Sequence, residues 1–199
     1  MKKMLLLPMA ALLLCAILFC GNLTSSKEIT EAKNSVIRLH VRAADDSPEE
    51  QALKLEVRDR ILSCTGELLQ DCETKEEALD LLNREIGRLE NAGKEAISAR
   101  GKDHDVTVTL NRERFEYREY DGFFLPEGEY DSLIVEIGPG EGQNWWCVVF
   151  PAACYLGAGE IETDAERMPD CFRTAKDRAR DVSVRFWLWD KIRGLFDGD

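Results

Sequence analysis

The sequence has little positive charge and little histidine. Of its 199 residues, 26 are lysine or arginine and 38 are aspartate or glutamate, and there are two histidines. The formal net charge of −12 opposes the phosphate backbone of nucleic acids and also the headgroups of anionic lipids. We therefore expect no nucleic-acid partner and no purely electrostatic attachment to a membrane.

The chain also lacks the usual signatures of a metal site. Its seven cysteines include no Cys-x-x-Cys pair, and only His40 and His104 could assist as imidazole ligands. The tripeptide Asp103-His104-Asp105 would need further ligands to hold calcium or zinc, so we interpret it as a turn. We expect neither a metal nor a cofactor.

One long hydrophobic run is present, at the N-terminus. Met1-Lys2-Lys3 is followed by the 16 uncharged residues from Met4 to Phe19. As a helix this run spans about 24 Å, less than a hydrocarbon core of about 30 Å. Residues 1–26 are therefore predicted to be a signal peptide. Because no clear Ala-x-Ala cleavage site follows, an uncleaved N-terminal membrane anchor is the alternative.

Residues 27–160 are predicted to form a single α+β domain after a short polar tether at residues 27–34. Capping-box patterns at residues 47–50 and 74–77 open two amphipathic helices, which are expected to end near Cys64 and Ala99. Alternating stretches predict about five strands, at residues 35–42, 106–110, 115–120, 132–137 and 143–150. This order predicts two amphipathic helices packed on one mainly antiparallel sheet.

Residues 161–199 are predicted to form a charged linker and a C-terminal amphipathic helix. The helix would run from Val182 to Phe196 and would carry Trp187 and Trp189. Its polar face has both signs of charge, unlike the basic face of most membrane-surface helices. We therefore expect it to pack on the domain or on a partner.

The first predicted strand has two different faces, because side chains alternate along a strand. One face is apolar, with Ile37, Leu39 and Val41, and the other is basic, with Arg38, His40 and Arg42. We interpret the basic face as a solvated, charged patch. The functional alternative is a small site for one acidic group of a partner.

The segment Asn144-Trp145-Trp146-Cys147 is the most unusual in composition. Trp145 and Trp146 point to opposite faces of a strand, and both faces are apolar. We expect both tryptophans in the core, and the alternative is that one of them anchors a partner protein.

Five cysteines lie outside the N-terminal segment: Cys64, Cys72, Cys147, Cys154 and Cys171. This odd number leaves at least one thiol without an intramolecular disulfide partner. Buried free cysteines, or one or two disulfides, are favoured over a metal site. Cys147 could be a nucleophile with His40 as its base, and a disulfide with Cys154 is the simpler alternative.

Three blocks of the sequence resemble stage II sporulation protein R of endospore-forming bacteria. They are SVIRLHVRAADDSPEEQALKLEVRD at residues 35–59, NWWCVVFPAAC at 144–154 and VRFWLWD at 184–190. The resemblance implies a signalling protein and not an enzyme. It implies export from the forespore into the space between the two septal membranes. There the protein would trigger a membrane-embedded aspartic protease of the mother cell, which cleaves the precursor of the early mother-cell sigma factor.

On this basis we predict an activator that binds the extracytoplasmic face of the membrane domain of that protease. The predicted contact residues are Arg38, His40, Arg42, Asp45, Asp46, Asn144, Trp145 and Trp146. Two alternatives remain open: a cell-wall hydrolase that uses Cys147 and His40, and a structural envelope protein that its C-terminal helix holds at the septal membrane.

Overall fold

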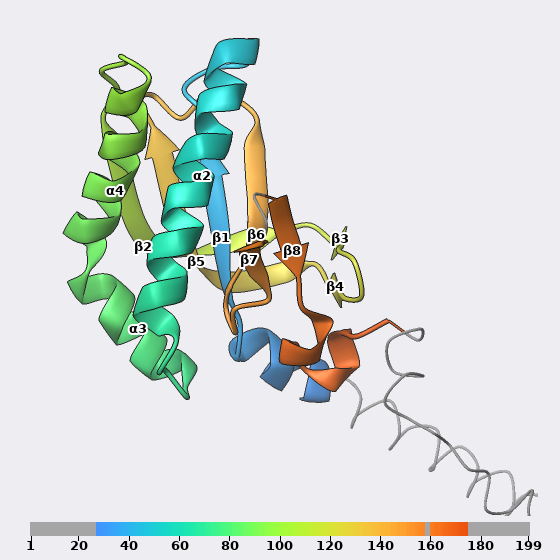
Figure 1. Cartoon of the computed structure of the whole chain (residues 1–199). Helices are drawn as coiled ribbons and strands as arrows, with labels where there is room; N and C mark the ends of the chain where they lie inside the picture. Colours follow the sequence, from blue (N-terminus) through green and yellow to red (C-terminus); the bar gives the residue numbers. More distant parts are fainter. Residues whose placement is uncertain (1–26, 158–159, 175–199) are drawn as a thin grey trace, which may run out of the picture.

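A four-stranded sheet lies at the centre of the computed structural model, which describes residues 27–157 and 160–174 (Figure 1). The strand order is β2-β5-β1-β6. These strands are β1 (Ile37–Arg42), β2 (Val106–Phe115), β5 (Gly128–Ile137) and β6 (Asn144–Phe150). The expected α+β class is confirmed. The sheet is mixed, since β1 pairs with β5 in parallel whereas the β1–β6 and β2–β5 pairs are antiparallel.

The predicted strand at residues 115–120 belongs to two different elements. Phe115 is the last residue of β2, and the chain then leaves the sheet. β3 (Arg118–Glu119) pairs with β4 (Phe124–Leu125) in a separate two-stranded ribbon. The central sheet therefore has one strand fewer than expected.

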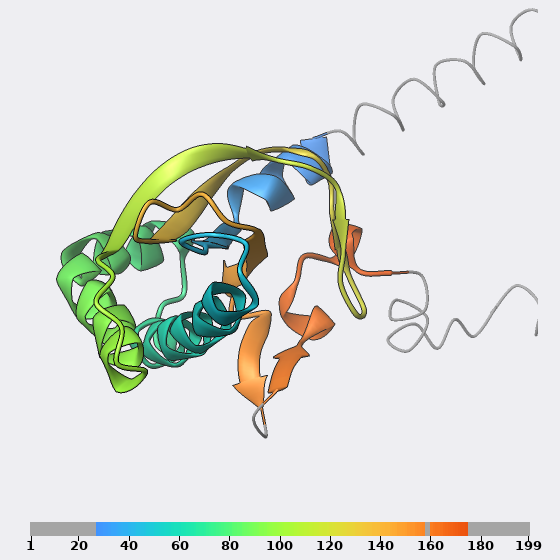
Figure 2. The same cartoon turned by 90° about the horizontal axis from the view of Figure 1, so that it is seen from above.

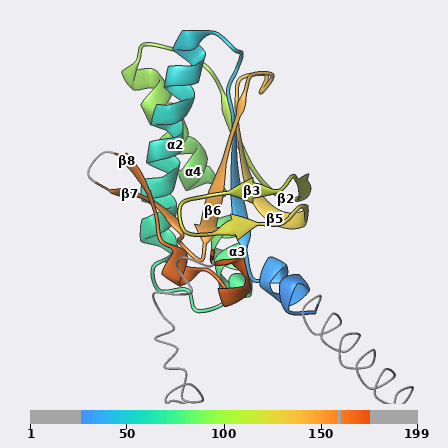
Figure 3. The ribbon, with the colours of Figure 1, turned by 90° about the vertical axis from the view of Figure 1, so that its right-hand side faces the viewer.

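Three helices cover one face of the sheet (Figure 3): α2 (Pro48–Leu69), α3 (Lys75–Arg84) and α4 (Ile86–Ala99). Both predicted helix starts are confirmed, because Ser47 caps α2 and the Thr74 capping box opens α3. The second predicted helix is divided in two at Glu85, which has φ −101° and ψ 12°. No side chain caps α4, and Gly87, a weak helix former, follows at once.

The larger hydrophobic core lies between these helices and the sheet. The apolar face of β1 is completely buried, as its alternation predicted. It packs with the apolar stripes of the helices and with the inner residues of β2 and β5; examples are Val57, Ile61, Leu82, Leu89, Ile97, Val108, Leu133 and Val135. Each of these side chains lies at the helical or strand period, so local pattern and burial agree.

A second, smaller core covers part of the opposite face of the sheet. Its buried side chains are Ala32, Val36, Phe115, Phe123, Leu125, Tyr130, Val148, Ala153, Met168 and Phe172. Residues 27–34, expected as a polar tether, are helical and contribute Ala32 to this core.

The packed domain extends past the expected boundary at residue 160. β7 (Cys154–Gly157) and β8 (Glu160–Thr163) form an antiparallel hairpin across that boundary. Two 3-10 turns follow, η1 (Ala165–Arg167) and η2 (Asp170–Phe172). Met168 and Phe172 are almost fully buried there, which makes these residues part of the domain.

Two predicted segments lie outside the described residues. They are the signal peptide or anchor at 1–26 and the C-terminal amphipathic helix at 182–196, and both stay predictions. Within residues 27–157 and 160–174, no helix combines the length and the hydropathy needed to cross a membrane.

The β5–β6 connection crosses the end of β1, because β5 and β6 lie on opposite sides of that strand. The Gly142 N–H donates to the Ala43 carbonyl oxygen at 2.9 Å. A Cβ atom at Gly142 would overlap the Asp45 carbonyl group and lie 2.9 Å from the Ala43 Cβ. Close approach of two backbones therefore requires glycine at this position.

We expect Gly142→Ala to lower the free energy of unfolding by about 2 kcal/mol, because the backbones must separate. Gly66→Ala is the matched control, since Gly66 lies within α2 and nothing lies within 4 Å of its added Cβ. That substitution is expected to raise stability by up to about 1 kcal/mol. Urea denaturation measures both changes, and the same sign for both would contradict the explanation.

Candidate partner-binding site

The face of the sheet opposite α2, α3 and α4, hereafter the outer face, carries polar side chains in its centre. Arg38, His40 and Arg42 share this face, as predicted. The prediction that these basic residues form a solvated patch is wrong, because Arg38 is 0% exposed and His40 is 6% exposed. β2 curves over this face in Figure 2, and the second core adjoins it, so the basic residues are covered by other parts of the chain.

Arg38 is a buried cation that contacts aromatic rings and, within residues 27–157 and 160–174, no carboxylate. Its Nη2 donates to the Tyr120 hydroxyl oxygen at 2.7 Å. Its Cζ lies 4.0 Å from the centre of the Phe115 ring and 5.3 Å from that of Tyr130. Its Nε and Nη1 have no partner among the described residues. Burial lowers the pKa of Arg38 and raises the pKa of Tyr120, because each charged form loses its hydration.

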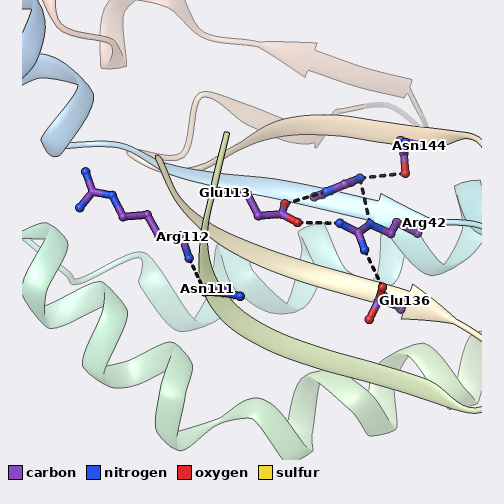
Figure 4. Close-up of polar contacts among 7 residues, drawn as sticks. Arg42, Asn111, Arg112, Glu113, Glu136 and Asn144 are labelled. Atoms are coloured by element: carbon purple, nitrogen blue, oxygen red, sulfur yellow. Dashed lines mark hydrogen bonds and ion pairs between the residues drawn. The ribbon is translucent and has the colours of Figure 1, made fainter. Parts of the chain in front are cut away.

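His40 and Arg42 contact the side chains of Glu113, on β2, and Glu136, on β5. Glu113 Oε2 accepts from His40 Nδ1 at 2.9 Å, and its Oε1 accepts from Arg42 Nη2 at 2.6 Å. Arg42 Nη1 donates to Glu136 Oε1 at 2.7 Å (Figure 4). His40 Nε2 lies 2.8 Å from Asn144 Oδ1. This network pairs Arg42 with two carboxylates and His40 with one, and Arg38 lies outside it.

Sequence reasoning missed Glu113 and Glu136. The predicted strands end at residue 110 and resume at residue 115, whereas β2 continues through residues 111–114 to Phe115. A strand of ten residues places Glu113 beside β1 although β5 lies between β2 and β1. The only local signal was the continued alternation of polar residues, which a solvated strand shows equally.

The two tryptophans lie on opposite faces of β6, as predicted. The centre of the Trp146 ring lies 5.5 Å from the centre of the His40 ring and 4.0 Å from the Arg118 Cζ. Trp145 packs against the core on the helix side, where the Arg58 Cζ lies 4.9 Å from its ring. Only Trp146 therefore joins the polar residues of the outer face.

Asp45 and Asp46 organise the chain at the end of β1. The Ser47 N–H donates to Asp45 Oδ1, and the Gln143 N–H donates to Asp46 Oδ1, each at 2.7 Å. The hydrogen bonds from Ser47 hold the pKa of Asp45 below its usual value. The Asp46 side chain thus binds the connection that leads into Asn144, whereas the Asp45 side chain binds the N-cap of α2, and both residues are exposed.

A cleft of about 350 Å³, hereafter the sheet-face cleft, opens on the outer face. It is lined by His40, Arg42, Glu113, Arg114, Phe115, Glu116, Arg118 and Trp146. The cleft thus unites three of the predicted contact residues with β2 and β3 residues that the sequence did not single out. Its walls combine both signs of charge with two aromatic rings.

Cys147 is bonded to Cys154, with 6.3 Å between their Cα atoms. The register also places Cys147 opposite Leu39 and Trp146 opposite His40. Because directly paired residues point to the same face, Cys147 and His40 lie on opposite faces of the sheet. The hypothetical Cys147–His40 catalytic pair is therefore excluded by geometry. Cys64 and Cys72 are free thiols whose pKa values are raised by burial.

The part of the chain that the structure describes contains no cluster of three or more His, Cys, Asp or Glu placed to hold a metal ion. His104 Nε2 lies 3.2 Å from Glu50 Oε1, and the same oxygen lies 3.3 Å from Lys102 Nζ. His104 is thus part of an ion-pair cluster at the start of α2.

Comparisons with known proteins agree with the resemblance seen in the sequence. The family model described as Stage II sporulation protein R matches residues 33–160. The chain is 29% identical over 134 residues to the stage II sporulation protein R of Bacillus subtilis (strain 168). This match covers 67% of the chain and 60% of the relative, which is less than two thirds of the relative's length. No solved structure matches.

Proposed function

The chain belongs to the stage II sporulation protein R family, and we propose that it is an exported signal that activates a membrane-embedded protease during sporulation. In this proposal the forespore exports the protein into the space between the septal membranes. There it binds the extracytoplasmic face of an aspartic protease of the mother cell. The activated protease then processes the precursor of the early mother-cell sigma factor.

The separation of Cys147 from His40 supports binding over catalysis. These two residues were the candidates for a nucleophile and its base, and they lie on opposite faces of β6 and β1. His40 is instead held by Glu113 and Asn144, which makes it part of a rigid polar surface. Such a surface is suited to recognition, because its side chains are already ordered before a partner arrives.

A binding protein activates an enzyme when it binds the active state more tightly than the inactive state. A hundredfold shift of that equilibrium needs about 2.7 kcal/mol of differential affinity, which a few well-placed contacts supply. The sheet-face cleft offers such contacts through Trp146 and the arginines beside it. No chemical step on this chain is needed.

Co-expression of the full chain, the protease and the sigma-factor precursor in a non-sporulating host tests the proposal. We expect precursor cleavage that depends on the chain and that is lost when residues 1–26 are deleted. A combined Cys147→Ser and Cys154→Ser variant is expected to retain cleavage at a temperature at which it is folded. Its free energy of unfolding should fall by about 2–3 kcal/mol, because the disulfide no longer restricts the unfolded chain.

Cys72→Ser is the matched control for the disulfide variant, since Cys72 is a half-buried free thiol. It should leave both cleavage and stability near those of the wild type. No cleavage with the wild-type chain would overturn the proposed function. Loss of cleavage by a folded disulfide variant would instead favour chemistry at Cys147.

A further inference from the structure

Arg118 of β3 is a cation at the sheet-face cleft that has no acidic partner among the described residues. Its guanidinium lies over the Trp146 ring, with 4.0 Å between Cζ and the ring centre. Within residues 27–157 and 160–174 it makes no ion pair and no hydrogen bond with a carboxylate. Arg42 in the same cleft differs, since Glu113 and Glu136 both accept from it. Arg118 is therefore available to an anion from outside.

Arg38 provides a second positive charge beside the same cleft. It stacks on Phe115, whose ring is part of the cleft wall, and it has no carboxylate partner among the described residues. Burial lowers the pKa of Arg38, and the positive charge of Arg118 lowers it further. The two cations thus repel each other where little water screens them. An anion bound at Arg118 would attract both and relieve this repulsion.

Two glutamates line the cleft, Glu113 and Glu116, and neither forms an ion pair with Arg118 in the described part of the chain. Glu113 is occupied by His40 and Arg42. Arg114 is exposed and reaches Glu127 only at 3.8 Å, so it adds a third positive charge at the rim. The lining thus holds three arginines and two glutamates, and Arg38 behind Phe115 adds a further positive charge, on a chain whose formal net charge is −12.

We propose that the sheet-face cleft binds an aspartate or glutamate side chain of a protein partner, with its carboxylate on Arg118 and its flanking chain against Trp146. A planar guanidinium matches a carboxylate with two parallel hydrogen bonds. The aromatic ring behind it holds the guanidinium in place and offers apolar contact to the neighbouring residues. The proposal rests on the proposed function only where it assigns this carboxylate to the protease.

The test measures binding of the full chain to the purified protease in one detergent, at about 50 mM and about 300 mM salt. Arg118→Glu is expected to weaken binding at low salt at least about tenfold, because attraction becomes repulsion. Arg118→Lys keeps the charge and should weaken binding less. Arg60→Glu is the matched control, since Arg60 is an exposed arginine of α2 that pairs with Glu95. It should change binding less than about twofold.

The salt dependence separates a lost charge contact from a damaged fold. Binding by the Arg118→Glu variant should fall less steeply with salt than binding by the wild type. Thermal unfolding checks each variant, and Arg118→Gln replaces Arg118→Glu if the latter does not fold. A lysine substituted for the correct extracytoplasmic acidic residue of the protease should restore binding to Arg118→Glu.

The outcomes distinguish this inference from the proposed function. Full binding and activation by folded Arg118→Glu would overturn the carboxylate site and leave the signalling role intact. Absence of binding and activation with the wild-type chain would overturn the signalling role. A third measurement tests binding to vesicles that contain phosphatidylglycerol. If Arg118→Glu weakens binding to these vesicles but not to the protease, the ligand of the cleft is a lipid phosphate and the proposed protein carboxylate is wrong.

Discussion

Replacing Glu113 with glutamine is expected to lower the free energy of unfolding by about 2–3 kcal/mol. Glu113 accepts from His40 Nδ1 at 2.9 Å and from Arg42 Nη2 at 2.6 Å, and its side chain is only 22% exposed. A neutral amide offers one acceptor and directs its NH₂ group at the other donor. The positive charge of Arg42 then depends on Glu136 alone.

Glu129→Gln is the matched control for Glu113→Gln. Glu129 lies on β5 next to the β2 edge strand, is exposed, and has no ion pair within the described part of the chain. Its substitution removes the same charge and should change stability by less than about 0.5 kcal/mol. Guanidinium chloride is itself a salt and would screen these ion pairs, so urea is the denaturant for this comparison. Equal small effects in both variants would show that the Glu113 contacts resemble ordinary surface ion pairs.

Replacing Arg38 with methionine is expected to raise the free energy of unfolding by about 1–3 kcal/mol while it weakens activation of the protease. Arg38 is wholly buried, has no carboxylate partner, and leaves Nε and Nη1 without acceptors in the part of the chain described. Methionine fills a similar volume against Phe115 and Tyr130 and needs no hydration. It also removes one of the two positive charges beside the sheet-face cleft.

Tyr120→Phe is the companion variant for Arg38→Met. It deletes the hydroxyl that accepts from Arg38 Nη2, so the buried cation loses its remaining side-chain acceptor. We expect a loss of about 1–3 kcal/mol, opposite in sign to the methionine variant. Thermal and urea unfolding of both variants, with the cleavage assay, measure these effects. A destabilised Arg38→Met protein would show that the contacts with the aromatic rings outweigh the lost hydration of the guanidinium.

The local parts of the fold were predictable because each depends on neighbours in the sequence. The capping residues Ser47 and Thr74 begin α2 and α3 where expected, since a cap bonds N–H groups within the next turn. The alternation in β1 assigned every side chain of that strand to its correct face. The division of the second helix at Glu85 was not predictable, because no proline marks it.

The composition of the candidate site was only partly predictable. The sequence singled out His40, Arg42 and Trp146, which the sheet-face cleft brings together. It did not indicate Glu113 or Arg118, whose positions depend on how far β2 extends and where β3 folds back. Strand order and register are set by contacts between residues far apart in the chain, so no short sequence pattern predicts them.

The sequence by itself determined the family, the α+β class, the two helix starts and which residues of β1 share a face. These depend on composition, on blocks of residues and on the periodicity of the backbone. Only the tertiary structure decided that Arg38 and His40 are buried, that Glu113 and Glu136 pair with Arg42, and that Cys147 lies away from His40. The physical reason is that burial and ion pairing depend on which strands become neighbours in the sheet. That arrangement is set only when the hydrophobic cores pack.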